Sequence, residues 1–258
     1  PGAGSDFTSI ATTAARSENG WVINGCKNSV SFAGVADAYI VWARTENKKS
    51  IWAFSSFLVP CGLPGVSAPE LWDDMGTRGT PRGVVHFDNV HIPYNYLVGV
   101  LGRGFEYAAE LYDTNRALIG LLCIGPARAS IDETVEYAKK REVSGYPISR
   151  YQAISFALAE GYTLLEAARL LCYKALWLAD KGIRHSVEGA MCKWWVPEIC
   201  FDVVRKCLLA HGHYGYTKDL PFEQRLRDIL GWHTGDGTQE VSKLIIARSL
   251  FGGKEFTG

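Results

Sequence analysis

The sequence has no surplus of charge of either sign and no long apolar run. Its 258 residues carry 27 Lys and Arg against 27 Asp and Glu, whereas a nucleic-acid-binding protein usually has a basic excess. No stretch of about 18 uninterrupted apolar residues occurs, which argues against a membrane-spanning helix. With 47% hydrophobic and 21% charged residues, the composition is typical of a globular protein that binds neither nucleic acid nor a bilayer.

The cysteines lack the spacing of a metal or redox motif. There are 7 of them, an odd number, and no C-x-x-C occurs. Several fall within apolar helical patterns, so we expect buried, reduced thiols in an intracellular protein. Cys207, His211 and His213 come nearest to a ligand cluster, but a second half-site is missing. We therefore predict no metal site.

Two common catalytic signatures are also missing. No G-x-S-x-G nucleophile elbow occurs, so a serine hydrolase of that kind is not indicated. The segment Gly102-Arg103-Gly104-Phe105 is too short for a dinucleotide fingerprint and does not follow a strand in a βαβ unit. The sequence therefore does not predict a Rossmann site.

The residue patterns change near residue 100. Before it, short runs of β-branched and aromatic residues alternate with Gly, Pro and Asn, and we expect strands at 21–25, 38–44, 51–59 and 84–87. Asn24-Gly25 favours a type I′ hairpin turn after the first of these strands. After residue 100 the apolar period becomes helical, and we expect helices at about 107–140, 154–172, 187–209 and 240–250, with a further segment from Pro221.

The predicted fold class is therefore α+β. An antiparallel β domain over residues 1–101 precedes a bundle of antiparallel helices over residues 102–258. Periodicity by itself predicts no chemistry. One loop stands out, because Gly235-Asp236-Gly237 places a carboxylate between two glycines. Such a loop can bring a base close to a ligand, although Asp and Gly are also the ordinary residues of a helix–helix turn, which the pattern alone favours.

A set of short motifs in a fixed order carries more information. They lie at 1–6 (P-G-A-G-S-D), 22–27 (V-I-N-G-C-K), 75–78 (M-G-T-R), 87–93 (F-D-N-V-H-I-P), 102–105 (G-R-G-F), 137–141 with 152–154, 227–228, 237–240 (G-T-Q-E) and 247–248. On these motifs the chain resembles the flavin-dependent acyl-CoA dehydrogenase family over essentially its whole length. The order and spacing are specific, whereas each motif alone is weak.

The resemblance implies a fold, a cofactor and a reaction. The family has an N-terminal helical domain, a middle β domain and a C-terminal four-helix bundle, and it is usually a homotetramer. We expect the first domain to be missing from this chain and the active site to need it. The implied reaction is α,β-dehydrogenation of an acyl-CoA thioester in fatty or alicyclic acid degradation, with the hydride passing to N5 of FAD. Electron-transfer flavoprotein is the expected acceptor, and the bacterial cytoplasm the expected location, with the mitochondrial matrix as the alternative.

The resemblance also assigns roles to residues. Asp236 stands where the family has its catalytic Glu, and Gly237 belongs to the same substrate-binding loop. Ser5, Asp113 and Arg116 match positions that contact the CoA tail. Arg141 matches an Arg that reaches the FAD of a neighbouring subunit. The full set of expected FAD contacts is Ser29, Val30, Ser31, Arg141, Gln152, Gly212, Thr238 and Glu240.

Each of these residues also has an ordinary structural interpretation. Asp113 and Arg116 are three apart on a predicted helix and are compatible with a surface ion pair. Arg141 is compatible with a cation at a helix end, and Ser31 with a strand surface.

The chain departs from the family where substrate and flavin are expected. The base is Asp instead of Glu, the preceding residue is Gly235, and Ser29 replaces a Trp. All three changes remove side-chain volume. Asn115 stands where some relatives carry an alternative base, so it supplies no second carboxylate. We interpret the roomier site as suited to a bulky acyl group, such as an alicyclic ring.

Three alternatives remain open from sequence. A nitroalkane-oxidase-like enzyme also uses an Asp base but no CoA, and the Asp113 and Arg116 pair favours the dehydrogenase over it. An acyl-CoA oxidase shares the base chemistry and differs in using oxygen as the acceptor. A non-catalytic interaction protein would have lost the base, whereas Asp236 keeps a carboxylate.

Overall fold

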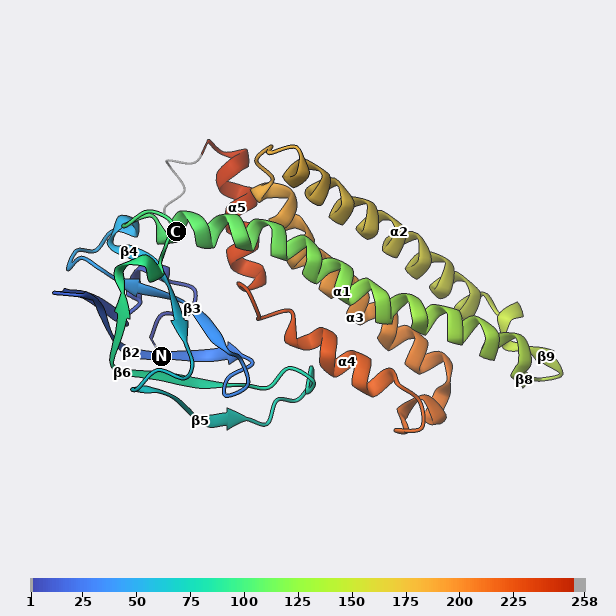
Figure 1. Cartoon of the computed structure of the whole chain (residues 1–258). Helices are drawn as coiled ribbons and strands as arrows, with labels where there is room; N and C mark the ends of the chain where they lie inside the picture. The colour runs from blue at the N-terminus through green and yellow to red at the C-terminus, as the bar shows by residue number, and fades with distance from the viewer. Residues whose placement is uncertain (1, 253–258) are drawn as a thin grey trace. The chain divides into compact units, whose positions relative to one another are not determined.

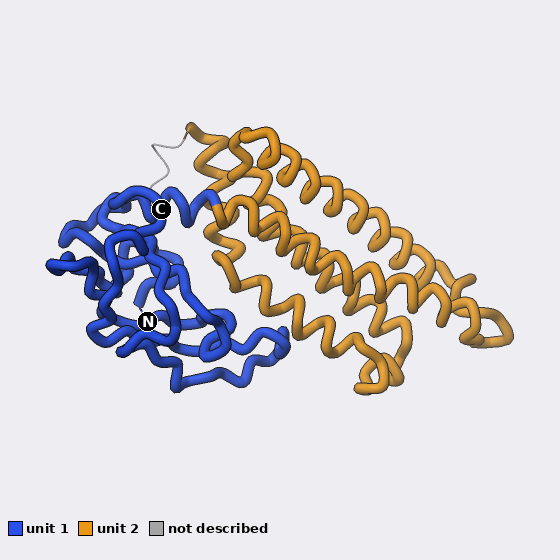
Figure 2. Tube along the Cα trace, viewed as in Figure 1, with its two compact units in different colours: residues 1–110 blue, residues 111–258 orange. Residues whose placement is uncertain are grey.

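The computed structural model describes residues 2–252 and forms two compact units, Pro1–Glu110 and Leu111–Gly258 (Figures 1 and 2). Pro1, which opens the first matching motif, and Gly253, beyond the last predicted helix, lie outside the described residues. The first unit is built around a β-sheet and the second from helices, which confirms the predicted α+β class.

The first unit, which we call the β unit, contains a mostly antiparallel sheet of seven strands in the order β5-β6-β2-β1-β3-β4-β7. The single parallel pair joins β1 and β3. The strands are β1 Thr13–Ser17, β2 Gly20–Ser31, β3 Ala38–Arg44, β4 Phe54–Pro60, β5 Val66–Trp72, β6 Arg82–Pro93 and β7 Leu97–Val98. Short 3₁₀ helices lie at η1 Phe7–Ser9, η2 Ile51–Ala53 and η3 Tyr94–Tyr96. Residues 51–53 of the predicted strand 51–59 are therefore helical.

Alternation of side chains explains how this sheet forms its core. Along β3, Tyr39, Val41 and Ala43 are buried while the residues between them are more exposed, as expected for a strand with one face inward. The core also contains Trp21 and Phe57, whose rings meet edge to face at 5.2 Å. Aromatic pairs in this geometry stabilise a core beyond the area they bury.

The hairpin turn expected at Asn24-Gly25 is wrong. Strand β2 continues through both residues, and the turn lies between Ser17 and Gly20. Gly25 instead marks a shift in register with β6, and a Cβ there would lie 2.8 Å from Thr12 Cα. Asn24 accepts a hydrogen bond from the Asn89 N–H at 2.8 Å. Asn-Gly is favourable in a turn, but the neighbouring strands here require a bulge with a close backbone approach.

The second unit, which we call the helical unit, is a bundle whose long helices lie side by side (Figure 1). Its helices are α1 Gly104–Lys140, which begins before the unit boundary, α2 Gln152–Asp180, α3 Ser186–Ala210, α4 Phe222–Gly231 and α5 Gln239–Leu250. A two-stranded hairpin, β8 Glu142–Val143 and β9 Tyr146–Pro147, and the 3₁₀ helices η4 Ile148–Arg150 and η5 Gly212–Tyr216 connect them.

The bundle core follows the spacing of buried residues along each helix. On α1 these residues alternate at separations of three and four, which places them on one stripe of the helix. The stripe consists of Ala117, Gly120, Ile124, Ala127, Ile131, Thr134 and Ala138. Five of the cysteines, Cys123, Cys172, Cys192, Cys200 and Cys207, lie in this core.

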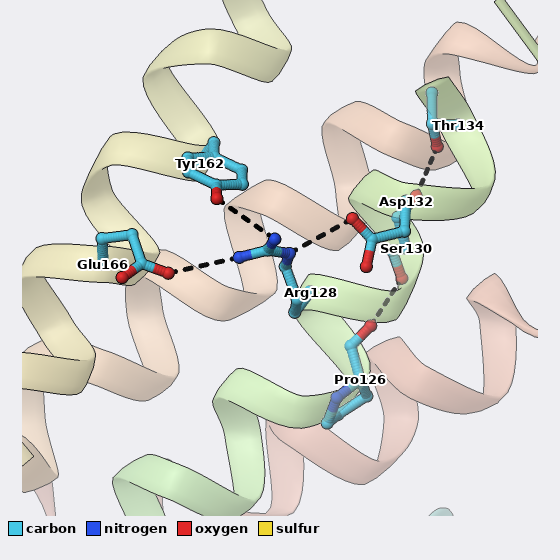
Figure 3. A network of polar contacts seen from close by, with 7 residues as sticks. All are labelled: Pro126, Arg128, Ser130, Asp132, Thr134, Tyr162 and Glu166. Atoms are coloured by element: carbon cyan, nitrogen blue, oxygen red, sulfur yellow. Dashed lines mark hydrogen bonds and ion pairs between the residues drawn. The ribbon is translucent and has the colours of Figure 1, made fainter. Parts of the chain in front are cut away.

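Arg128 links α1 to α2 on the outside of the bundle (Figure 3). Its guanidinium donates to Glu166 and to the Tyr162 hydroxyl, each at 3.2 Å. Also on α1, the Ser130 hydroxyl donates to the carbonyl of Pro126 at 2.8 Å, a bond that serine in a helix often makes to the residue four positions earlier. The side chains of Arg128 and Glu166 are both more than a third exposed (37% and 34%), so this ion pair contributes little to stability.

In the described part of the chain, no helix is both long and apolar enough to cross a membrane.

His211 lies at the end of α3. Its Nδ1 lies 2.9 Å from the Cys207 carbonyl, and its ring stacks on Tyr137 with ring centroids 4.1 Å apart. His211 therefore packs against the protein from two sides.

Candidate active site

The loop between α4 and α5 carries Asp236 in an uncommon backbone conformation. Asp236 has φ 54° and the next residue, Gly237, has φ 99°. A positive φ costs most side chains about 1–2 kcal/mol, but Asp is among the residues that tolerate it best. Thr238 then begins α5 as its N-cap, because its hydroxyl accepts a hydrogen bond from the Val241 N–H at 3.3 Å. The backbone conformation of this loop therefore fixes the direction in which the Asp236 side chain leaves the backbone.

Asn115 on α1 holds this carboxylate. Its side-chain amide donates a hydrogen bond to Oδ2 of Asp236 across 121 positions of sequence. An amide N–H is a donor, so this hydrogen bond fixes the position of the carboxylate oxygen that accepts it. Asn115, which is not itself a carboxylate, therefore supports the carboxylate of Asp236.

An ion pair on α1 lies beside the same loop. Arg116 donates to Asp113 at 2.9 Å, and the Ser186 hydroxyl donates to the other oxygen of Asp113. Only 9% of the Arg116 side chain and 16% of the Asp113 side chain are exposed, so the interpretation as a surface pair is wrong. A Cβ added to Gly237 would lie 3.9 Å from Arg116 Nη2, which places the guanidinium next to the Asp236 loop.

A second buried cation comes from α3. Lys193 has no exposed surface, and its ammonium donates to the Trp232 carbonyl at 2.7 Å. Burial lowers the pKa of Lys193 to about 8, while the negative charge of Asp236 acts to raise it. Burial raises the pKa of Tyr112, and the charge of Asp236 adds to that effect. Asp236 thus lies within electrostatic range of both groups.

The close contact between α1 and α3 at this site depends on Gly189. A Cβ at Gly189 would lie 2.4 Å from the backbone oxygen of Asp113. We expect Gly189→Ala to lower the free energy of unfolding by about 2 kcal/mol, the usual cost of overpacking, as measured by urea denaturation. Gly125→Ala is the matched control, since nothing lies within 4 Å of its added Cβ. An equal loss in both variants would contradict the close-packing argument.

The remaining predicted residues of the helical unit form two groups. Thr238 caps α5 next to Asp236, and Glu240 is exposed in the first turn of that helix. Arg141 follows the last residue of α1, and Gln152 begins α2. Along an α-helix, the 25 residues from Arg116 to Arg141 span about 37 Å. Arg141 and Gln152 therefore cannot share a site with Asp236 of the same chain.

Gly212 lies near Arg141. It follows His211, whose ring stacks on Tyr137 in the last turns of α1. Gly212 itself is exposed and has φ 62°. Three of the expected FAD residues thus gather at the end of the bundle that is remote from the predicted base.

In the β unit, the expected flavin contacts lie at the end of β2. The register with β6 passes from Lys27↔Val85 directly to Val30↔Gly83, which leaves two residues of β2 opposite one residue of β6. Ser29, one of the two, is exposed and has φ 54°. Bulges of this kind often re-aim a strand beside a ligand, which fits a cofactor contact. Ser5 is exposed and precedes η1.

A cavity of about 350 Å³ in the β unit borders Val30 and Ser31. Its walls also include Lys27 and the apolar residues Val41 and Phe87. No carboxylate lines it, and burial lowers the pKa of Lys27 in its wall to about 8.

Sequence reasoning missed the residues that support Asp236. Asn115 was noted only as a lost base, and Lys193 and Ser186 were not singled out. A signal for Lys193 was present, because Gly189, Lys193, Val196 and Cys200 repeat at separations of four, three and four and a Lys on such a stripe is expected to be buried.

The chain thus forms a β unit followed by a helical bundle, with a carboxylate on the last interhelical loop. Two family models match its sequence: the acyl-CoA dehydrogenase middle domain over residues 1–90 and the acyl-CoA dehydrogenase C-terminal domain over residues 102–251. The chain is 38% identical over 97% of its length to benzylmalonyl-CoA dehydrogenase of Aromatoleum aromaticum. It is 31% identical, also over 97%, to cyclohexane-1-carbonyl-CoA dehydrogenase of Syntrophus aciditrophicus.

A solved structure agrees with these matches. Butyryl-CoA dehydrogenase of Megasphaera elsdenii superposes with a TM-score of 0.94 at 30% identity, covering 97% of this chain and 66% of that one. The chain belongs to the acyl-CoA dehydrogenase family. It spans 66% and 65% of the two curated relatives, just under two thirds of each.

Proposed function

We propose that this chain is part of an FAD-dependent enzyme that introduces an α,β double bond into an acyl-CoA thioester, with Asp236 as the general base. The observation that carries the proposal is the held carboxylate of Asp236. It lies on a conformationally fixed loop, accepts a hydrogen bond from Asn115 and is flanked by the buried cations of Arg116 and Lys193. A general base must be held in a fixed direction toward the proton that it removes.

The proposed role of each residue follows from its contacts. Asn115 engages Oδ2 of Asp236, so we assign Oδ1 to the proton: the α-carbon loses its proton to Oδ1, and the electron pair of that C–H bond forms the new double bond. The thioester carbonyl gains negative charge as this happens. The backbone N–H of Asp236 is proposed to donate to that carbonyl, and fixed donors of this kind stabilise developing charge.

Bound FAD would accept the hydride that leaves the β-carbon. We propose contacts to it from Ser29, Val30 and Ser31 in the β unit and from Thr238 and Glu240 in the helical unit. The bulge at Ser29 is compatible with such a contact. We propose that four residues lie near the acyl-CoA: Ser5, Asp113, Arg116 and Gly237. Arg116 is buried, so only a small part of its side chain is open to contact with the substrate.

The remote residues suggest an oligomer. Arg141, Gln152 and Gly212 lie at the end of the bundle away from Asp236, so they fit contacts to the FAD of a neighbouring copy. We propose a homotetramer on this basis, with electron-transfer flavoprotein as the electron acceptor. The two curated relatives are bacterial, which favours a bacterial cytoplasmic enzyme.

The acyl group is proposed to be bulky near its α-carbon. Asp236 is one methylene shorter than Glu, and Gly235 before it has no side chain. Both relatives cited above carry a ring in the acyl group that their names specify, one aromatic and one alicyclic. We therefore infer a ring-bearing acyl-CoA as the substrate.

Substitution of the base tests this substrate class. We expect Asp236→Glu to retain a base and to shift the preference between cyclohexane-carbonyl-CoA and a straight-chain acyl-CoA toward the straight chain by about 10-fold, the effect of one methylene in a pocket. The measurement is kcat/KM for the two substrates. An unchanged ratio would reject the ring-bearing substrate and leave the assignment of the base intact.

The proposed function itself is tested by titrating the FAD-loaded protein with acyl-CoA under anaerobic conditions. We expect cyclic acyl-CoA to bleach the flavin absorption band within the mixing time of a rapid-kinetics experiment, and straight-chain acyl-CoA to do so more slowly. Oxygen added after reduction separates the two acceptors, because rapid reoxidation indicates an oxidase. Failure of every acyl-CoA to reduce the flavin would reject the proposed function.

A further inference from the structure

Lys193 is a buried charged residue to which the family comparison assigned no role. It lies in the core-facing stripe of α3 between Gly189 and Val196, and none of its surface is exposed. Burial of an unpaired ammonium is costly, so buried lysines normally have a compensating partner. The structure shows two sources of compensation, and both lie on the segment that carries Asp236.

The first source is the end of α4. The ammonium donates to the carbonyl of Trp232, the C-cap residue of that helix, at 2.7 Å. The last carbonyls of a helix lack partners within the helix and carry the negative end of its dipole, so a cation there is favourable. Lys193 thereby fixes the point at which the chain leaves α4, four residues before Asp236.

The second source is Asp236 itself. Its negative charge opposes the effect of burial on the pKa of Lys193, which still falls to about 8. Cys123, which also faces Lys193, has its pKa raised to about 12 by burial and stays neutral near pH 7. Arg116 acts in the opposite direction to Asp236. Asp236 thus acts to raise the pKa of Lys193, against the larger effect of burial.

We propose that Lys193 is a positioning residue for the catalytic base: its buried ammonium holds the Trp232 carbonyl, and with it the loop of residues 232–237 that carries Asp236. This inference rests on the proposed function, because it assumes that Asp236 is the base. It assigns one effect to the side chain, a tether through Trp232.

A second, exposed tether on the same helix supplies a control. Glu198, five residues further along α3, accepts a hydrogen bond from Gln239 at 3.1 Å and lies 3.7 Å from His233. It therefore also holds the α4–α5 segment, but its side chain is 58% exposed. Glu198→Ala removes a tether and leaves the buried cation in place, which makes it the matched control.

The test compares Lys193→Met, Lys193→Arg and Glu198→Ala in the FAD-loaded protein. Two measurements are made: the rate of flavin reduction by acyl-CoA in rapid mixing, and the binding of a non-reacting acyl-CoA analogue. We expect Lys193→Met to slow flavin reduction about 100-fold with the binding of the analogue unchanged, because a small misplacement of a catalytic group is costly. Lys193→Arg and Glu198→Ala should stay near the parent rate, since the first keeps a buried donor and the second removes an exposed contact.

Hydrogen exchange of the amides of residues 232–238 reports the tether independently of activity. We expect faster exchange in Lys193→Met than in Glu198→Ala, with parent-like melting temperatures confirming that both variants fold. Unchanged exchange in Lys193→Met would overturn the tether, and faster exchange at the parent rate of flavin reduction would overturn the positioning role. If Lys193→Met unfolds, Lys193→Gln replaces it in the same comparison. If Asp236→Asn retains the parent rate while Lys193→Met exchanges faster, the proposed function fails and the tether stands.

Discussion

Replacing Asp236 by Asn should slow the reduction of bound FAD by acyl-CoA about 10²–10⁴-fold, the usual contribution of a positioned general base. The amide has nearly the same shape as the carboxylate, but it cannot accept the α-proton at neutral pH. Asn115 can still donate to the new side-chain oxygen, so the loop should keep its conformation. Rapid-mixing absorbance at the flavin band measures the rate.

Two controls accompany this variant. FAD content and the binding of a non-reacting acyl-CoA analogue should match the parent protein, which separates loss of chemistry from loss of the site. Asp219→Asn removes an exposed carboxylate between α3 and α4 and should leave the rate unchanged. If Asp236→Asn reduces its flavin at the parent rate, the base is another group.

Replacing Arg116 by Ala should lower the free energy of unfolding by about 3 kcal/mol, because removal of one partner leaves the other charge of a buried pair uncompensated. The pair joins Arg116 to Asp113, and Asp113 also accepts from Ser186 on α3. Denaturation by urea measures the change. The double variant Arg116→Ala with Asp113→Ala should recover part of the loss, since no lone charge then remains.

Arg205→Ala is the matched control for this prediction. Arg205 forms an ion pair with Asp202 at 2.6 Å and at the same spacing of three residues, but the two side chains are 49% and 40% exposed. Its removal should cost less than about 1 kcal/mol, as is usual for a surface pair. A loss of stability for Arg116→Ala no larger than that of the control would contradict the structural role.

The assignment of Arg116 to the CoA tail makes a different prediction. Contacts to a part of the substrate that does not change during the reaction raise KM without lowering kcat when they are removed. A large rise in KM for acyl-CoA at parent stability would support substrate binding by Arg116. A loss of stability at unchanged KM would instead assign Arg116 to the support of Asp113 and of the neighbouring loop.

Several features of this protein were determined by the sequence alone. The change of period near residue 100 predicted the change from strands to helices, because apolar spacing reflects which residues face a core within one element. The ordered motifs indicated the family, and the resemblance to that family, not the pattern of the Gly235-Asp236-Gly237 loop, predicted Asp236 as the base. Local signals were less reliable where packing opposes them: Asn24-Gly25 favours a turn by itself, yet β2 continues through both residues, opposite a bulge in β6 at residues 88 and 89.

Only the tertiary structure decided what surrounds the candidate base. Asn115 lies 121 residues from Asp236, and Lys193 lies 39 residues from Trp232. No local pattern predicts such pairs, since they depend on which faces of α1, α3 and the last loop meet. The structure also showed that Arg116 is buried and that Arg141 lies at the remote end of α1. Helical period determines which residues share a face of one helix, whereas the packing of separate helices determines which charges come together and which lose contact with water.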